Sequence, residues 1–318
     1  MKGNNIPLVS VIMPVFNRQL FLLETIKSIR KQTYENWELI AVDDGSTDDS
    51  LKALKEFSKK DNRIKTFSRP ETLNKGANAC RNYGFEKAEG VYVNWFDSDD
   101  FMLPNFIQEK VEAFDENGNV DLVLSKTVRV YPDGKRVFEK RTNLTKSLLE
   151  DYITADVSWY LPDGMFKKSC LDSYLLFDEN VMAGQDRDFY IRNIIRCKVV
   201  ILNKYLTEYY CHQASISHSL YRTNNYKLQL SVLENLMNQV DFLKEKELLS
   251  KRLKKHYFIE IKNKLPSVMK CNSLKKEYFL ILYELSEGGK TNLIIWIKIL
   301  VAYFSFLTFG KGQRFLKF

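Results

Sequence analysis

Short apolar runs alternate with longer amphipathic stretches over the first hundred residues of the chain. The apolar runs predict strands over residues 8–13, 37–42, 63–67 and 91–96, and the stretches between them predict helices over 18–32, 47–60 and 73–88. Strands and helices that alternate at this spacing predict a mostly parallel, Rossmann-like sheet flanked by helices. In such sheets the ligand binds at the carboxyl ends of the strands.

The pattern changes after the fourth strand. It predicts a helix over 105–114, strands over 120–125, 199–202 and 206–210, and a hairpin that joins 126–131 to 135–140. From about residue 224 onward the pattern is helical. We therefore predict an α/β domain over residues 1–220, followed by a helical C-terminal region over 221–318.

Positive charge is concentrated in the C-terminal region. Residues 244–277 carry eleven basic residues against four glutamates, which leaves +7 of the net charge of +8. Two interpretations remain open: a solvated helical face, or a surface that contacts an anionic membrane. Nucleic acid is disfavoured as a partner, because no aromatic and basic residues are interleaved there in a recognised nucleic-acid motif.

A second feature of the C-terminal region is an apolar stretch over residues 293–309. Only Lys298, Ser305 and Thr308 are polar in these seventeen residues, a length at the short limit for crossing a bilayer. A buried terminal helix, a helix that lies at a membrane interface and a membrane span all remain open. The expected location is the cytoplasm, with possible peripheral attachment to the cytoplasmic face of the inner membrane.

The cysteines and the N-terminus agree with that location. The five cysteines are odd in number and widely spaced without a CxxC motif, which favours reduced thiols over disulfides or a zinc site. The apolar run over 8–16 is interrupted by Pro14 and is interpreted as a strand, not as a signal peptide.

The densest group of acids, Asp97-Ser98-Asp99-Asp100, directly follows the fourth predicted strand. Three carboxylates this close repel one another unless a cation or solvent offsets their charge. A hard divalent ion such as Mg²⁺ or Mn²⁺ prefers oxygen ligands of this kind. The alternative is a helix start with acidic residues in its first turn.

Polar residues also follow the second and third predicted strands. The run from Asp43 to Asp48 suits recognition of a nucleobase, since a carboxylate can accept the imide N–H of uracil, but it also suits a strand-to-helix turn. Asn74-Lys75-Gly76 and Arg81 supply cations that can hold a diphosphate, or they are the exposed basic residues of an ordinary helix.

Four motifs occur here in the order and spacing of family 2 glycosyltransferases of the GT-A fold. They are Pro14-Val15-Phe16-Asn17, Val42-Asp43-Asp44-Gly45-Ser46-Thr47-Asp48, Asn74-Lys75-Gly76 with Arg81-Asn82, and Asp97-Ser98-Asp99-Asp100. The chain resembles this family over about residues 7–215. The resemblance implies a GT-A fold, with the C-terminal third outside it.

For the donor side, the resemblance implies contacts to the nucleotide, its phosphates and its sugar. The expected donor-binding residues are Pro14, Phe16, Asn17, Asp43, Asp44, Lys75, Arg81 and Asp97, with Asp44 as the direct contact to the base. Phe16 stands where the family more often has Tyr, which loses a hydroxyl and keeps the stacking surface. Asp99, Asp100 and His212 are the expected ligands of a divalent metal, Mn²⁺ or Mg²⁺.

For the acceptor side, Gly184-Gln185-Asp186 resembles the acidic motif of the family, with Gln185 in place of its usual Glu. Asp186 is then the expected general base, with Asp188 as its rival. Trp159, Tyr160 and Gln185 are the candidate contacts to the acceptor.

Together these residues predict an inverting glycosyltransferase that uses a nucleotide-diphosphate sugar, with a UDP-sugar favoured. The expected acceptor is a hydroxyl of a glycan or of a lipid-linked glycan in bacterial surface polysaccharide biosynthesis. A nucleotidyltransferase is disfavoured because residues 14–20 lack a Gly-rich phosphate loop, and no GxxxxGK[ST] motif indicates a P-loop kinase. A non-catalytic nucleotide-sugar-binding protein remains the alternative outside enzymes.

Overall fold

The computed structural model describes residues 6–138, 144, 147–171, 176–212, 226–269, 276–286 and 301. The chain divides into two compact units. The first, called the sheet unit, comprises Met1–Thr145, Asp156–Asn180 and Gln185–His212. The second, called the helical unit, comprises Lys146–Ala155, Val181–Gly184 and Gln213–Phe318.

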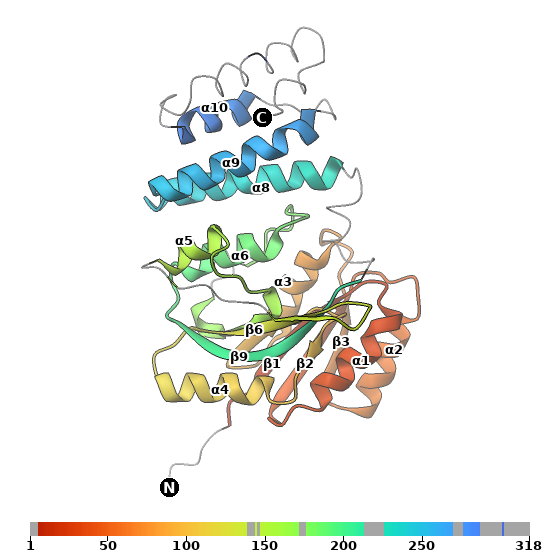
Figure 1. The fold of residues 1–318 in the computed structure, drawn as a ribbon. Helices are drawn as coiled ribbons and strands as arrows, with labels where there is room; N and C mark the ends of the chain where they lie inside the picture. Colours follow the sequence, from red (N-terminus) through yellow and green to blue (C-terminus); the bar gives the residue numbers. More distant parts are fainter. Residues whose placement is uncertain are drawn as a thin grey trace. The chain divides into compact units, whose positions relative to one another are not determined.

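A nine-stranded mixed sheet forms the centre of the sheet unit (Figure 1). Its strands are β1 (Val9–Val15), β2 (Trp37–Asp43), β3 (Ile64–Ser68), β4 (Tyr92–Trp95), β5 (Phe101–Met102), β6 (Leu122–Val130), β7 (Arg136–Phe138), β8 (Gly164–Lys167) and β9 (Val199–Tyr210). The order is β3-β2-β1-β4-β8-β6-β9-β5, and β7 pairs with β6. The first four strands are parallel, as the alternation of strands and helices predicts.

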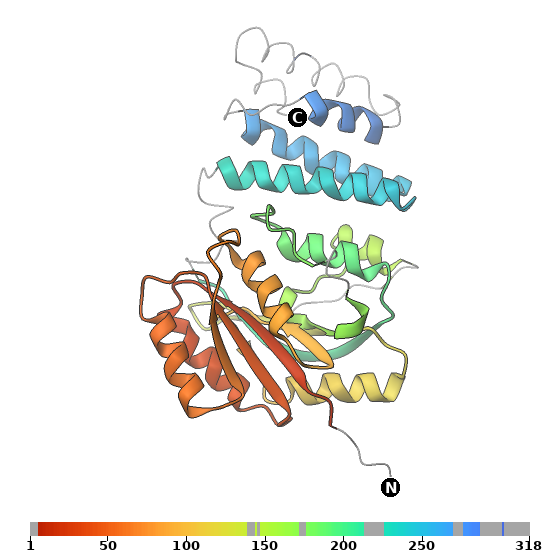
Figure 2. The ribbon, with the colours of Figure 1, turned by 180° about the vertical axis from the view of Figure 1, so that it is seen from behind.

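Helices cover both faces of the parallel half (Figures 1 and 2). The helices of the sheet unit are α1 (Gln19–Arg30), α2 (Ser50–Lys60), α3 (Ala77–Lys87), α4 (Phe106–Asn117) and α6 (Gln185–Ile194). Alternate residues of β1, such as Val11 and Met13, share one buried cluster with Leu22 and Ile26 of α1. Ile12 points to the other face, where a Cβ added at Gly84 of α3 would lie 2.4 Å from its Cγ2 atom. This glycine therefore lets α3 approach β1 closely.

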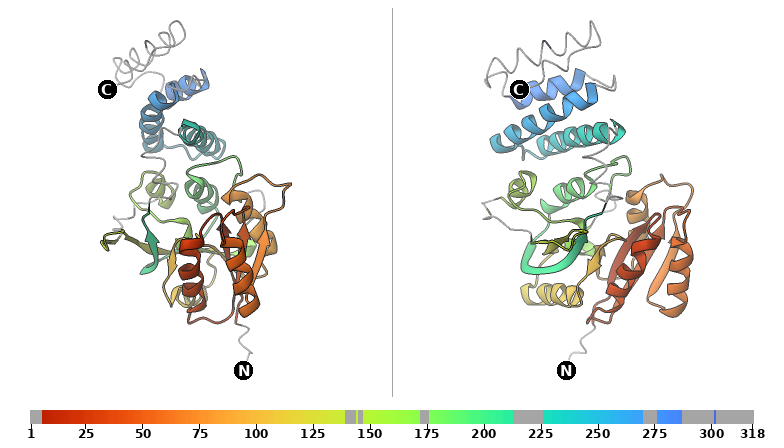
Figure 3. Two further views of the ribbon diagram at one scale, coloured as in Figure 1. Left: turned by 90° about the vertical axis from the view of Figure 1, so that its right-hand side faces the viewer. Right: turned by 45° about the vertical axis from the view of Figure 1, so that its right-hand side comes forward.

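The other half of the sheet departs from the simple pattern. β8 runs antiparallel between β4 and β6, and the two-residue strand β5 pairs with β9. Neither β8 nor β5 was predicted, and the two short strands expected over 199–202 and 206–210 are one strand, β9. Its register against β6 shifts on both sides of Lys126, and β9 follows a curved path (Figures 1 and 3). Such bulges bend a strand, which explains why the apolar pattern of β9 is interrupted.

The helical unit contains α5 (Leu148–Ile153), α8 (Tyr226–Glu245), α9 (Lys251–Met269) and α10 (Lys276–Leu285). Buried side chains such as Leu233 and Val240 of α8 and Tyr257 and Ile261 of α9 form its core. Arg252 of α9 forms an ion pair with the buried Asp151 of α5, with 3.0 Å between Nη1 and Oδ1.

Within the part of the chain that the structure describes, we find no helix with the length and apolar character needed to cross a membrane. The apolar stretch over 293–309 lies outside the described residues, apart from residue 301.

Candidate functional site

The first part of the site is the loop that follows β1. Phe16 is 39% exposed, and the Nζ atom of Lys75 lies 4.5 Å from the centre of its ring. Asn17 has a positive φ of 51°, which Asn tolerates better than most residues. Its Oδ1 atom accepts a hydrogen bond of 2.8 Å from the backbone N–H of Thr47, which joins this loop to the loop after β2. Pro14 is a buried residue of β1, the strand from which this loop extends.

The second part is the pair of acids at the end of β2. Oδ2 of Asp43 accepts hydrogen bonds of 3.0 Å from the N–H groups of Gly45 and Ser46, so this carboxylate closes the turn. Oδ1 of Asp43 is buried and has no hydrogen-bond partner among the described residues. Oδ1 of Asp44 accepts a hydrogen bond of 2.5 Å from Nε of Arg69.

The third part is the run of acids after β4, where Asp97 meets Arg81 of α3. Nη2 of Arg81 lies 3.0 Å from Oδ1 of Asp97, and Nη1 donates to Oε1 of Gln185 at 2.9 Å. Burial, together with repulsion from Asp99 and Asp186, raises the pKa of Asp97 against the attraction of Arg81. Asp186 is therefore within electrostatic reach of the acids near position 99.

Asp99 is held from two sides. Its Oδ2 atom accepts hydrogen bonds from Nε of Arg18 at 3.0 Å and from Nε2 of His212 at 2.9 Å. Burial alone would raise the pKa of Asp99, but the hydrogen bond from His212 and the charge of Arg18 lower it. The His212 ring stacks on Phe21, with 4.5 Å between ring centres.

Asp100 completes the run and is almost fully buried. Its Oδ1 atom accepts a weak hydrogen bond of 3.4 Å from the N–H of Tyr210, and Oδ2 has no partner among the described residues. Burial and repulsion from Asp99 and Asp97 raise the pKa of Asp100 well above its ordinary value. A buried oxygen without a partner, among acids that repel one another, has the donor chemistry that a hard divalent cation satisfies.

The same acids are not arranged as a finished metal site. Among the residues that the structure describes, no three His, Cys, Asp or Glu side chains converge closely enough to hold a metal ion. The reason is visible at Asp99, because Arg18 and His212 occupy its Oδ2 atom. The donor set fits a divalent cation in chemistry, and binding requires these side chains to turn.

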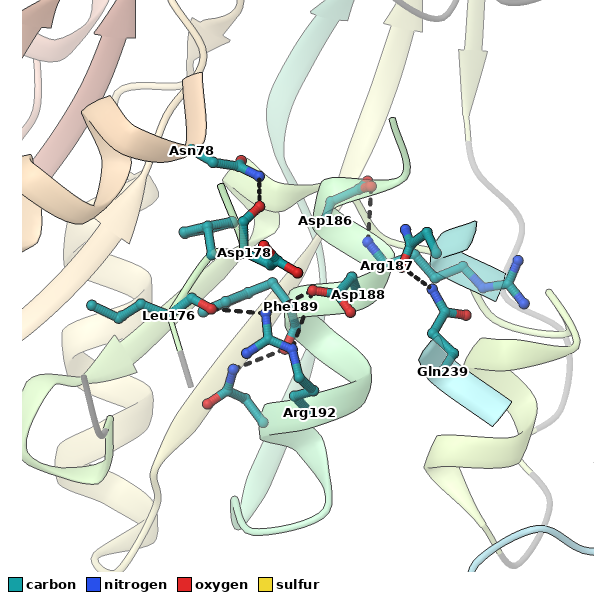
Figure 4. A network of polar contacts seen from close by, with 12 residues as sticks. Asn78, Leu176, Asp178, Asp186, Arg187, Asp188, Phe189, Arg192 and Gln239 are labelled. Carbon is teal, nitrogen blue, oxygen red and sulfur yellow. Dashed lines mark hydrogen bonds and ion pairs between the residues drawn. The ribbon is translucent and has the colours of Figure 1, made fainter. Parts of the chain in front are cut away.

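The fourth part is the start of α6, which carries both candidate bases (Figure 4). Asp186 is half-buried in the first turn, and its Oδ1 accepts a hydrogen bond of 2.8 Å from the N–H of Arg187. Asp188 is buried, and its Oδ2 lies 2.7 Å from Nη2 of Arg192, which also donates to the carbonyl of Leu176. Because Asp188 is committed to this ion pair, the geometry favours Asp186 as the acid that can accept a proton.

Helix α3 connects the segment that precedes α6 to the sheet. Nδ2 of Asn78 donates to the carbonyl of Asp178 at 2.6 Å (Figure 4), and Nδ2 of Asn82 donates to the carbonyl of Phe177 at 2.9 Å. Arg81 of the same helix bonds both Gln185 and Asp97, so α3 connects the start of α6 to the residues after β4. The sequence places these segments about a hundred residues apart.

The three candidate acceptor contacts have other partners. Trp159 is only 3% exposed and packs edge-on against Tyr190, which is a core position. Tyr160 stacks on Tyr209 with 5.1 Å between ring centres. Gln185 is held by Arg81. The burial of Trp159 leaves too little of its ring exposed to form a wall for an acceptor.

Two arginines of the site were missed by sequence reasoning. Arg18 directly follows the motif at 14–17, but nothing in the sequence indicates its pairing with Asp99, 81 positions away. Arg69 directly follows β3, so the rule that ligands bind at strand ends pointed to its position but not to its partner, Asp44.

Residues 10–190 match the family model described as glycosyl transferase family 2, which is more than half of the chain. An uncharacterized glycosyltransferase of Haemophilus influenzae is 42% identical over 113 residues, which cover 36% of this chain and 44% of that protein. A Campylobacter jejuni protein, named GalNAc(5)-diNAcBac-PP-undecaprenol beta-1,3-glucosyltransferase, is 27% identical over 258 residues, or 76% of this chain and 78% of that one.

Solved structures share the fold at low identity. The structure of Staphylococcus aureus TarS 1–349 with UDP-GlcNAc has a TM-score of 0.65 at 19% identity and covers 97% of this chain and 90% of that one. The mannosyltransferase PcManGT from Pyrobaculum calidifontis, with GDP-Man and Mn²⁺, has a TM-score of 0.55 at 14% identity, covering 98% and 86%. The predicted GT-A fold is thereby confirmed.

The first five curated relatives are longer than the part they share with this chain. The matched part covers between 25% and 55% of their length.

Proposed function

Because the chain belongs to glycosyl transferase family 2, we propose that it transfers a sugar from a nucleotide-diphosphate donor to a hydroxyl group, with inversion at the anomeric carbon. One observation supports this proposal above the others. Arg81 bonds both Asp97, at the end of β4, and Gln185, the neighbour of Asp186. These two contacts support the assignment of the donor acids and of Asp186 to one site.

Asp186 is the proposed general base. It removes the proton from the acceptor hydroxyl while that oxygen attacks the anomeric carbon from the face opposite the diphosphate. Single displacement of this kind inverts the configuration, as it does between the separated carboxylates of inverting glycosidases. The first turn of α6 suits an ionised carboxylate, because the helix N-terminus carries partial positive charge.

Donor binding is proposed at the strand ends. Phe16 offers an exposed ring for the base, Asp44 an acceptor for its N–H group, and Lys75 a cation for the diphosphate. Both terminal nitrogens of Arg81 donate to side chains of the site, those of Asp97, Gln185 and Asn78. We therefore assign it to positioning these side chains, and not to the phosphates. Asn17 and Asp43 shape the two loops that border the nucleotide.

A divalent cation, Mn²⁺ or Mg²⁺, is proposed as the cofactor, with Asp99, Asp100 and His212 as the residues that would hold it. When bound, such an ion offsets the negative charge that develops on the departing diphosphate. Oδ2 of Asp100 and Nδ1 of His212 are buried without partners among the described residues, so each would gain one from such an ion once the side chains around Asp99 have turned.

The acceptor is proposed to be a glycan or a lipid-linked glycan of a bacterial surface polysaccharide, and the protein to lie in the cytoplasm. Similarity to the Campylobacter jejuni protein named GalNAc(5)-diNAcBac-PP-undecaprenol beta-1,3-glucosyltransferase supports this class of acceptor.

Exposed lysines of α9, such as Lys251 and Lys255, suit peripheral contact with an anionic membrane. Co-sedimentation with phosphatidylglycerol vesicles tests this contact, and equal recovery with neutral vesicles would reject it.

We assign different functions to the two regions of the chain. Residues 1–220 would bind the donor and carry the chemistry, and residues 221–318 would dock the enzyme near its acceptor. A nucleotidyltransferase, or a protein that binds nucleotide sugars without turnover, is the second candidate. Only the crowded acids of the site favour these two alternatives. Neither of them explains the half-buried Asp186 beside these acids.

A screen of nucleotide sugars with Mn²⁺ tests the proposed function. We expect slow donor hydrolysis that releases a free nucleoside diphosphate, because water can replace the acceptor. In a parallel assay that supplies a nucleoside triphosphate and a sugar 1-phosphate, release of pyrophosphate would indicate a nucleotidyltransferase. Donor binding without any product in either assay would indicate a binding protein. Asp115→Asn, which alters an exposed acid of α4 outside the site, serves as the control.

A further inference from the structure

Asp44 lies where a nucleobase would meet the sheet. Its backbone N–H donates to the carbonyl of Val15 at 2.8 Å, which joins the end of β2 to the end of β1, one residue before the exposed Phe16. The side chain of Asp44 is only 7% exposed, so its carboxylate has little contact with water. The direction in which its two oxygens point therefore determines what it can bind.

Arg69 fixes one of these two oxygens. Its Nε donates to Oδ1 of Asp44 at 2.5 Å, while Nη1 donates to the carbonyls of Pro70 at 2.9 Å and Leu73 at 2.6 Å. The side chain of Arg69 is 12% exposed, and its planar guanidinium is held by acceptors on both sides. It therefore cannot swing away from Asp44 without losing the bonds to the loop at 70–73.

The other oxygen, Oδ2 of Asp44, has no hydrogen-bond partner among the described residues. Asp44 thus offers one carboxylate oxygen to a ligand, not two. A carboxylate with both oxygens free accepts two parallel N–H groups, as it does from a guanidinium. With Arg69 in place, the two oxygens cannot each accept one of two parallel N–H groups, and a ligand is left with Oδ2.

The bases differ in the edge that they present to such an acceptor. Uracil and thymine offer one imide N–H between two carbonyls, whereas guanine offers two adjacent donors, its N1–H and its exocyclic amino group. Guanine at Asp44 would have to direct both donors at Oδ2, where at most one of them has good geometry, and sites reject ligands strongly when a buried polar group is poorly paired.

We infer that Arg69 is a specificity-determining residue, which leaves Asp44 a single acceptor and so selects an imide-bearing pyrimidine nucleotide over a guanine nucleotide. This inference rests on the proposed function and names the class of its donor. Solved proteins of the same fold hold either UDP-GlcNAc or GDP-Man, so the fold alone does not decide the base.

Calorimetric binding of UDP, dTDP and GDP to the full chain in Mn²⁺ tests the inference. We expect UDP or dTDP to bind about tenfold more tightly than GDP, the effect of roughly one unpaired polar group. In Arg69→Gln, both oxygens of Asp44 become available, and this ratio should fall to about threefold or less. Arg63→Gln is the matched control, because Arg63 pairs with Asp61 at the amino end of β3, the end opposite to Arg69.

The outcomes separate this inference from the proposed function. A protein that binds none of the three nucleotides loses both. A protein that binds GDP as tightly as UDP keeps its proposed function and loses the inference. Equal weakening of UDP and GDP by Arg69→Gln also overturns the inference, because it indicates that Arg69 only supports the loop at 70–73.

A second measurement covers the case in which Arg69→Gln fails to fold, as judged by thermal unfolding. The wild-type protein is then tested with UDP that carries a methyl group on N3 of uracil, which removes the imide N–H. We expect binding to weaken about tenfold. Unchanged affinity for the methylated nucleotide would refute the single-acceptor arrangement without any variant.

Discussion

Three acids at the ends of the parallel strands each accept a hydrogen bond from an arginine, whereas Asp186 at the start of α6 forms no ion pair with the residues that the structure describes. The pairs at the strand ends are Asp44 with Arg69, Asp97 with Arg81 and Asp99 with Arg18. Among those residues, Asp186 accepts a single hydrogen bond, from the backbone N–H of Arg187.

The difference separates two uses of a carboxylate. An acid that pairs with a guanidinium is held in one orientation, and the positive charge favours its ionised form even where burial raises its pKa, as at Asp97. Such an acid suits the binding of a ligand better than the uptake of a proton. An acid without a fixed counter-ion can accept a proton and release it again, as a general base must. Asp188, two residues further along the same helix, belongs to the first class because it pairs with Arg192.

The largest expected effect comes from the unpaired acid. Asp186→Asn keeps the shape of the side chain and removes the base, so kcat should fall by about 10²- to 10⁴-fold. Affinity for the nucleotide should stay within about twofold, because Asp186 does not contact the proposed donor site. Steady-state transfer assays and calorimetry measure the two quantities.

Asp188→Asn is the comparison for this experiment. It breaks the ion pair with Arg192, so it should lower the melting temperature more than the turnover of the folded fraction. If Asp188→Asn abolishes transfer and Asp186→Asn does not, the distinction between paired and unpaired acids is wrong.

The second prediction concerns the paired acid that is also a proposed metal ligand. Removal of divalent ions with EDTA, or the substitution Asp99→Asn, should lower transfer by about 100-fold, since a bound cation supplies several kcal/mol of charge stabilisation. Asp99→Asn should also weaken Mn²⁺ binding, measured by electron paramagnetic resonance, while Asp115→Asn leaves it unchanged. Full turnover in EDTA after dialysis would remove the metal from the mechanism.

Much of the donor side could be predicted because its residues follow strands that the apolar pattern marks. Asp43 and Asp97 stand directly at the ends of buried runs, and all seven residues of β1 and of β2 are buried. The local sequence therefore determines both the strand and the place of the acid.

The arginine pairs could not be predicted in the same way. Arg81 and Gln185 lie 104 positions apart, and their contact depends on how α3 and the start of α6 pack together. In the other half of the sheet, β8 and β5 were missed and β9 was predicted as two strands, because β5 has two residues and β9 is bulged. In that half, apolar periodicity gives a weak signal and tertiary pairing decides the structure.

The smallest expected effect sharpens the role of the longest-range pair. Arg81→Lys keeps the charge but cannot bond Asp97, Gln185 and Asn78 at once, because an ammonium group lacks the planar fork. Gln185→Glu keeps the size and adds a charge that competes with Asp97 for Arg81. If Arg81 positions the two acids, each variant should lower kcat about tenfold, the effect of one hydrogen bond to a charged group. KM for the donor should rise less than kcat falls, because neither residue is assigned to the phosphates. A rise in KM alone would instead indicate that Arg81 binds the diphosphate of the donor. Asp97 would then no longer count among the acids that an arginine holds.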